Sequence, residues 1–262
     1  MSTRVTSAAL AALVLAGSPL LAQDFQWRGK VAAGKTVEIK GVNGAIDATA
    51  GGDEVEVVAT KHSRRSDPSS VRVEVVPSED GVTICAVYPD VDGRRNECRP
   101  GRGGHMNTRD NDVEVHFTVK VPAGVGLVAR TVNGEVEATG LEGDVDARTV
   151  NGSIQVSTTG RAEAETVNGS IRASAGRADW TGDAAFKTVN GSITLTLPAS
   201  MAADVRAETV NGAIETDFPL SLSGGLKLEG GRMRHLKGTI NGGGRSLEME
   251  TVNGSIHLKQ GS

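Results

Sequence analysis

Apolar and polar residues alternate with a period of two along most of the chain. The alternation is plain in VRVEVV at 71–76, in VEVHFTVKV at 113–121 and in ITLTL at 193–197. This period is typical of β-strands that bury one face. Beyond the N-terminal segment, no window carries the apolar stripe at i, i+3, i+4 and i+7 that an amphipathic helix needs. The pattern therefore predicts an all-β protein.

A six-residue unit, TVNGSI or a near copy of it, recurs along the chain. TVNGSI itself stands at 149–154, 166–171, 188–193 and 251–256, and near copies stand at 41–46, 131–136, 209–214 and 239–244. Between Asn133 and Asn211 the copies are roughly twenty residues apart, a spacing typical of repeat architectures. The wide gap before Asn241 and the narrow gap after it indicate an insertion followed by a shortened last unit.

Two architectures fit alternating strands around a repeated Asn-Gly. An antiparallel β-hairpin meander would place a two-residue turn at each Asn-Gly. A parallel β-solenoid would stack equivalent residues of successive units in ladders. The residue before each asparagine is always Val or Ile, and a hairpin would turn it to the polar face. We therefore predict the solenoid, with Val150, Ile154 and Val156 inside and Asn151 outside, and we keep the meander as the alternative.

The chain divides into an N-terminal targeting segment and one β-repeat domain. Arg4, the apolar run at 8–15 and the small Ala22 predict a signal peptide at 1–22. Residues 23–262 form the predicted domain, with irregular opening rungs at 23–125 and regular repeats at 126–262. We expect Phe25 and Trp27 to close the open end, because a solenoid needs a cap against edge-to-edge addition. The polar segment 89–111 is predicted to be a long insertion.

Export of the chain would place its two cysteines in an oxidising compartment. The apolar run at 8–15 is too short to span a membrane, and no other apolar run reaches that length, so we expect no transmembrane segment in the mature chain. The mature protein would lie in the periplasm, at the cell surface or outside the cell. In an oxidising compartment, two cysteines predict a disulfide between Cys85 and Cys98. A zinc site at Cys98 and His105 would have too few ligands.

Composition limits which residues can form the core and which classes of partner the protein can attract. Glycine supplies 34 of the 262 residues, while Phe, Trp and Tyr number 4, 2 and 1, so the core must consist of thin layers of Val, Ile, Ala and Leu. The formal net charge is −4, which provides no general attraction for nucleic acid.

The recurring T-V-N-G-S-I units, led by DVEVHFTVKVPAGVGLVARTVNGEVEATGLEGDVDARTVNGSI, carry a family resemblance. The chain resembles the bacterial DUF4097 family of candidate adhesins over nearly all of its mature length. The resemblance implies a β-helix-like fold in the cell envelope. It implies no catalytic residues.

A search for catalytic chemistry finds no nucleophile elbow, metalloprotease helix, phosphate loop or dinucleotide fingerprint. We therefore predict no enzyme activity, no cofactor and no metal. Parallel β-helices also host polysaccharide-degrading enzymes, and the acids Glu135, Glu137, Asp144 and Asp146 are close in sequence. A carbohydrate-active enzyme is thus one alternative, for which a clustered acid pair in a groove would speak. A structural protein that polymerises is the other.

The insertion at 89–111 has the one local excess of basic charge. Its arginines are Arg94, Arg95, Arg99, Arg102 and Arg109. Guanidinium groups bind carboxylates and phosphates, so this loop is a candidate site for anionic envelope glycans. The alternative is a merely solvated loop. The predicted function is an exported adhesin or binding scaffold whose partners are envelope glycans or other surface proteins.

Overall fold

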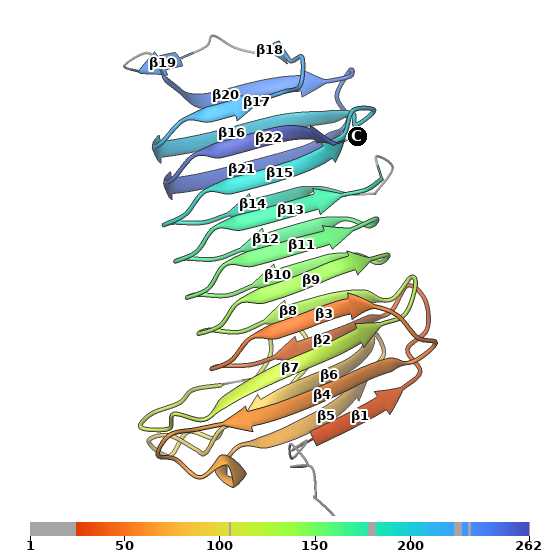
Figure 1. Ribbon diagram of the computed structural model, residues 1–262, viewed down its shortest axis with the longest axis vertical. Coiled ribbons are helices and arrows are strands. Elements are labelled where there is room, and N and C mark those ends of the chain that lie inside the picture. The colour runs from red at the N-terminus through yellow and green to blue at the C-terminus, as the bar shows by residue number, and fades with distance from the viewer. Residues whose placement is uncertain (1–24, 105, 178–181, 223–226, 230–231, 262) are drawn as a thin grey trace, which may run out of the picture.

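Two β-sheets face each other along an elongated stack (Figure 1). The computed structural model describes residues 25–104, 106–177, 182–222, 227–229 and 232–261. Within these ranges the only helical segment is a short 3-10 turn, η1, at Pro68–Ser70. The prediction of an all-β protein is confirmed. The predicted signal peptide at 1–22 lies outside the described residues.

Sheet A contains the strands that follow the Asn-Gly units and three further strands at one end of the stack. In spatial order they are β1 (Phe25–Gly29), β4 (Val55–His62), β7 (Glu114–Val121), β3 (Ile46–Ala50), β9 (Val136–Leu141), β11 (Ile154–Thr158), β13 (Ile171–Ala175), β15 (Ile193–Pro198), β22 (Ile256–Gly261) and β17 (Ile214–Thr216).

Sheet B contains the strands that precede the units and further strands at both of its ends. In spatial order they are β5 (Arg72–Ser78), β6 (Gly81–Val87), β2 (Thr36–Lys40), β8 (Gly126–Arg130), β10 (Val145–Arg148), β12 (Ala162–Glu165), β14 (Ala184–Lys187), β21 (Arg245–Asn253), β16 (Ala203–Asn211), β20 (Arg232–Ile240) and β18 (Ser221–Leu222), with β19 (Lys227–Glu229) also paired to β20.

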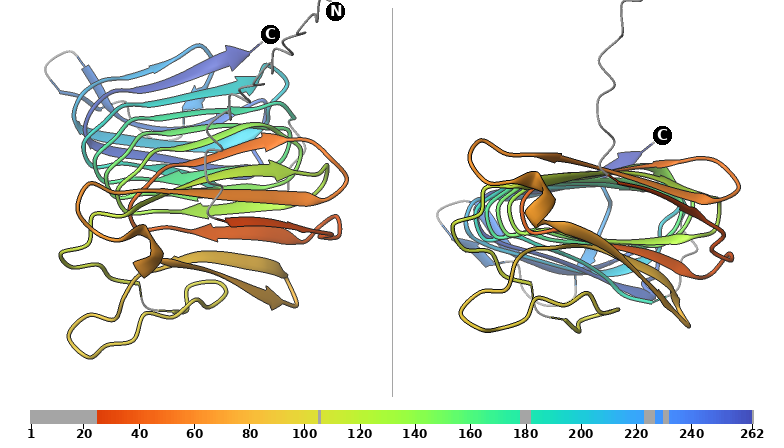
Figure 2. Two further views of the ribbon diagram at one scale, coloured as in Figure 1. Left: turned by 60° about the horizontal axis from the view of Figure 1, so that its bottom comes forward. Right: turned by 90° about the horizontal axis from the view of Figure 1, so that it is seen from below.

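One strand of sheet B and the sheet A strand that follows it form a rung, and we call the link between them the corner. Successive rungs pair in parallel, with equivalent repeat positions side by side. Ile154, for example, lies beside Val136 on one neighbour and Ile171 on the other. Seen along the stack, the two sheets form the long sides of a flattened coil (Figure 2). The predicted β-solenoid is confirmed.

Each position of the repeated unit has its own role at the corner. The threonine is 2–6% exposed in the regular rungs, and its hydroxyl donates to a glycine carbonyl of the adjacent rung, as Thr166 does to Gly152 at 2.9 Å. The asparagine side chains form a hydrogen-bonded ladder on the outside, where Asn168 donates to Asn151 at 2.8 Å. The glycine allows the rungs to stack, because a Cβ on Gly152 would lie 2.0 Å from the carbonyl oxygen of the glycine below it.

The predicted orientation of the valine is wrong. The valines before the asparagines in the regular rungs are 36–55% exposed. Threonine takes the inward position, because its methyl group fits the core while its hydroxyl satisfies a backbone carbonyl that would otherwise be buried without a partner. The chain then turns at Val-Asn, so both side chains point outward. The inward positions of Ile154 and Val156 are as predicted.

The C-terminal rung does not lie at the end of the stack. β21 pairs in parallel with β14 and with β16, and β22 lies between β15 and β17. Asn253 accordingly bonds both Asn190 and Asn211 in the ladder. Asn241 lies outside the ladder, in the turn between β20 and β21, and its amide donates to the Met201 carbonyl at 2.7 Å. The prediction of a shortened repeat unit at this point is therefore wrong.

The opening segment contributes true rungs and a cap. β2 and β3 stack in parallel on β8 and β9, so the unit at 41–46 is a rung as predicted. β1 and β5 run antiparallel to their neighbours at the edges of the two sheets. Phe25 and Trp27 on β1 pack against the core, in agreement with the expected cap. No helix in the described ranges has the length and apolar character that a membrane crossing requires.

Candidate functional site

The insertion at 89–111 takes the place of one corner. It connects β6 to β7, which pair in parallel with β2 and β3 of the next rung. Val42, the valine of that neighbouring rung, is only 4% exposed. Tyr88 donates its hydroxyl to the Val113 carbonyl at 2.7 Å, and burial raises the pKa of Tyr88 to about 12. The insertion therefore begins and ends on a packed, neutral base.

A buried ion pair on β2 anchors the middle of the insertion. The Lys40 ammonium donates to the carbonyls of Arg99, Gly101 and Gly103 at 2.5, 2.6 and 3.2 Å. The Glu38 carboxylate accepts the Gly101 N–H at 2.8 Å and lies 3.6 Å from Lys40. Burial lowers the pKa of Lys40, while the charge of Glu38 opposes that shift. Glu38 also lies 3.2 Å from Arg130, so removing Lys40 would leave Glu38 paired with Arg130, whereas removing Glu38 would leave the buried Lys40 without its acidic partner.

A second anchor lies at the base of the insertion. The Asn96 side chain donates to the carbonyls of Pro89 and Asn107 at 2.8 and 2.7 Å and accepts the Asn107 N–H at 2.8 Å. A disulfide joins Cys85 on β6 to Cys98, with a Cα–Cα distance of 5.7 Å, which is the pairing expected from the sequence. These bonds make the insertion an ordered part of the fold.

Asp112 ties the strand after the insertion to the loop that follows β4. Its carboxylate accepts the backbone N–H groups of Ser66, Arg65 and Arg64 at 2.8, 3.1 and 3.3 Å. These hydrogen bonds, led by that from Ser66, lower the pKa of Asp112 to about 2. The carboxylate is therefore ionised at any pH at which the protein would function.

The five arginines of the insertion are all exposed, and the structure separates them into two groups. Arg99 pairs with Glu97 at 2.9 Å, and Arg109 pairs with Asp92 at 2.7 Å. The remaining arginines, at 94, 95 and 102, have no acidic partner among the described residues. The uncompensated positive charge thus lies on a backbone that the buried anchors hold in place.

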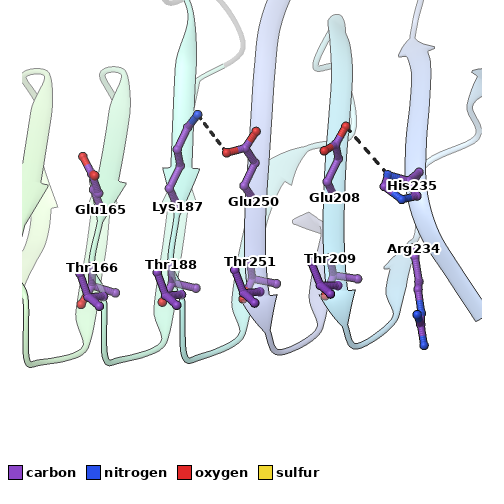
Figure 3. Close-up of a pocket in the computed structure, with 14 residues that line it drawn as sticks. Glu165, Thr166, Lys187, Thr188, Glu208, Thr209, Arg234, His235, Glu250 and Thr251 are labelled. Carbon is purple, nitrogen blue, oxygen red and sulfur yellow. Dashed lines mark ion pairs between the residues drawn. The ribbon is translucent and has the colours of Figure 1, made fainter.

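A second surface feature is a column of charged side chains on the outer face of sheet B, one residue before each threonine. From β8 onward along the stack they are Arg130, Arg148, Glu165, Lys187, Glu250 and Glu208, followed by His235 on β20. Figure 3 shows the last five in one row above the threonines. A groove of about 480 Å³ runs between this column and the exposed valines over the five rungs from β12 to β20.

The acids that suggested a glycosidase-like site are dispersed. Glu137 lies on sheet A and accepts hydrogen bonds from its neighbours there. Asp146 lies on sheet B and pairs with Arg148 at 2.8 Å, and Asp144 pairs with Arg161 at 3.6 Å. Among the described residues, no group of three or more His, Cys, Asp or Glu side chains is placed to hold a metal ion. His105, which the zinc alternative would need, lies outside the described residues.

Sequence reasoning found the arginines of the insertion but missed its anchors. Lys40 and Glu38 stand in an ordinary alternating strand, and nothing in their spacing shows that a loop some sixty residues later covers them. The charged residue before each threonine was visible in the sequence, but the order of these charges along the stack was not, because the last unit along the chain is inserted between two others. The valine edge beside these charges was not visible either, because the valines were expected inside.

Comparisons with known proteins return distantly similar solved structures. No protein-family model matches the chain, and no curated protein matches it. A candidate cell adhesion protein from Clostridium sporogenes is 12% identical with a TM-score of 0.45, over 90% of this chain and 99% of the other. A candidate adhesin from Bacteroides fragilis is 12% identical with a TM-score of 0.39, over 90% and 96%. The resemblance to the DUF4097 family stays a prediction.

Proposed function

We propose that the protein is an exported, non-enzymatic binding scaffold of the cell envelope whose insertion binds an anionic polymer. The observation that carries the proposal is the contrast within the insertion. Its backbone is bonded to a buried ion pair and to a disulfide, while three of its arginines are exposed and have no acidic partner within the part of the chain that the structure describes. A loop that only needed to be soluble would require no such anchors.

The chemistry of these side chains indicates the ligand class. A guanidinium donates paired hydrogen bonds that match the geometry of carboxylate and phosphate groups. Because the backbone is already ordered, binding would cost little conformational entropy there. Glycans that carry uronate or phosphate groups repeat these anionic groups along the polysaccharide, so several arginines could bind one glycan molecule.

Binding without turnover fits the acidic residues. Most enzymes that hydrolyse glycosidic bonds use two carboxyl groups that flank the bond. Here Glu137 and Asp146 lie on different sheets, and the Asp146 carboxylate is already paired with arginine. Several carboxylates of the regular rungs, among them Asp146, Glu165 and Glu250, thus belong to ion pairs with arginine or lysine.

The test is retention on immobilised polygalacturonate, with neutral dextran as the reference matrix. Replacing Arg94, Arg95 and Arg102 with Ser should reduce retention on polygalacturonate and leave the melting temperature unchanged. Wild-type retention should also fall with added salt, because the Debye length shortens from about 10 Å at 0.1 M to about 3 Å at 1 M.

The matched control removes three exposed cations from strands outside the insertion, Arg172, Lys237 and Lys259, again by replacement with Ser. This variant has the same net charge as the first and should be retained nearly as well as wild type. Equal losses in the two variants would show that only net charge matters and would contradict the proposal. Release of oligosaccharides by the purified protein would contradict its non-enzymatic part.

A further inference from the structure

Six exposed valines form a continuous apolar edge along the stack. We call this the valine edge; in stack order its members are Val132, Val150, Val167, Val189, Val252 and Val210. Each is 36–55% exposed. With strands about 4.8 Å apart, the edge is about 24 Å long. Exposed aliphatic side chains in one unbroken row are unusual for a surface in contact only with water.

The charged column beside the edge has a defined order. Along the same six rungs the signs run plus, plus, minus, plus, minus, minus, from Arg130 to Glu208. Reading this order backwards inverts every sign. A surface with that property is complementary to a copy of itself turned end to end.

We propose that two copies of the chain associate antiparallel along their valine edges, related by a two-fold axis between the rungs of Val167 and Val189. This axis places Val150 against Val252 of the second copy. Arg148 then faces Glu250 of the second copy. In the same register, Arg130 faces Glu208 and Glu165 faces Lys187. The methyl groups of one edge would pack against those of the other and into the groove beside them.

Charge selects this orientation over the alternative. Two copies that run in the same direction would be related by an axis along the stack, which puts the two charged columns on opposite sides of the paired valine edges. That arrangement forms no ion pairs between the columns, whereas the antiparallel one brings opposite charges face to face. The antiparallel contact is also isologous, and such contacts close after two copies instead of growing into a filament.

The cations of the column also form ion pairs within their own chain. Arg130 is the least available of them, because it lies 3.2 Å from the buried Glu38 and donates to the Gly101 carbonyl of the insertion at 2.8 Å. Arg148 lies 2.8 Å from Asp146 and 3.3 Å from Glu165, and Lys187 lies 3.2 Å from Glu250. Arg148 and Glu250 themselves are three rungs apart, about 14 Å, and cannot pair within one chain. Any direct coupling between these two positions therefore reports a contact between copies.

The antiparallel arrangement would carry the two insertions to opposite ends of the pair. The insertion leaves the stack at the rung of β6 and β7, two rungs before the valine edge begins. A pair would thus present its two arginine-rich insertions in opposite directions and could bridge two surfaces. The association itself does not rest on the proposed anionic ligand.

Site-directed cross-linking tests the register. Val150→Cys and Val252→Cys proteins are prepared separately, with the native disulfide intact, then mixed and oxidised. We expect a disulfide-linked dimer in the mixture and little in either protein alone, because each cysteine should face the other position. Cross-linking of each protein with itself as efficiently as in the mixture would overturn the antiparallel register. The absence of cross-links in every sample would overturn the contact.

Charge reversal gives an independent test by sedimentation equilibrium. Arg148→Glu alone and Glu250→Arg alone should each weaken association by at least about tenfold, since each creates two like-charge contacts per dimer. The double variant should recover association near wild type, which an effect within one chain could not produce. Urea melts check that all three variants are folded. A wild-type protein that stays monomeric at about 1 mM would refute the proposal.

Discussion

Two opposite substitutions at adjacent residues of one corner test which of the two side chains faces the core. Thr188→Val replaces a hydroxyl with a methyl group, and Val189→Thr replaces a methyl group with a hydroxyl. Thr188 is 5% exposed and donates to the Gly169 carbonyl at 2.9 Å, whereas Val189 is 39% exposed. Thr188→Val keeps the shape of the side chain but leaves that carbonyl without its side-chain donor. A buried polar group without a partner costs about 1–3 kcal/mol. We therefore expect a loss of about 1–2 kcal/mol in the free energy of unfolding.

Val189→Thr is the matched control, because it places the hydroxyl one residue later, where water can satisfy it. Surface substitutions of this kind change stability by no more than about 0.5 kcal/mol. Urea unfolding followed by circular dichroism measures both variants. In a chain of this size, a loss of 1 kcal/mol also lowers the melting temperature by about 2–4 °C. A stable Thr188→Val protein together with a destabilised Val189→Thr protein would refute the inward threonine and restore the inward valine.

Three further outcomes follow from the packing and the charges. Gly169→Ala should lower the free energy of unfolding, measured in urea melts, by at least about 2 kcal/mol, because its Cβ would lie 2.0 Å from the carbonyl oxygen of the stacked glycine. Gly176→Ala is the control and should be nearly neutral, because the nearest atom to its Cβ would be 3.5 Å away. Thiol labelling of the denatured, unreduced chain should find no free cysteine, and reduction should cost about 3 kcal/mol and increase hydrogen exchange in the insertion. Because the pKa of Asp112 is lowered to about 2, against about 3.9 in an unfolded chain, its stabilising contribution is complete above about pH 4 and is lost as the pH falls toward 2; NMR should show the Ser66 amide losing exchange protection in that interval and not above it.

The general fold could be predicted from the sequence because the same six residues recur at a nearly regular spacing. Identical residues at equal spacing lie beside one another when rungs pair in parallel, and strands of period two then have one face for the core. The asparagines of the regular units formed the expected ladder for this reason. The pairing of Cys85 with Cys98 could be predicted by counting, since the chain has only two cysteines.

The sequence could not decide which residue of each corner faces inward. Threonine and valine are nearly the same shape, both favour strands, and a binary pattern assigns valine to the core. The choice depends on a carbonyl of the neighbouring rung, such as that of Gly169, which needs a donor. This partner is far away in sequence and becomes visible only when the rungs are stacked. The valine edge was missed for the same reason.

The order of the rungs was likewise decided by tertiary structure. The unit at 251–256 is identical to three others, so its sequence is equally compatible with several places in the stack. Its place between β14–β15 and β16–β17 depends on β20, which runs antiparallel to β16 and returns the chain to the gap on the other side of that strand. The sequence alone determined the repeat, the strand period and the disulfide, because these depend on local pattern or on a count. The inward threonine, the inserted C-terminal rung and the anchored insertion depend on hydrogen bonds between distant segments, and only the folded chain brings those partners together.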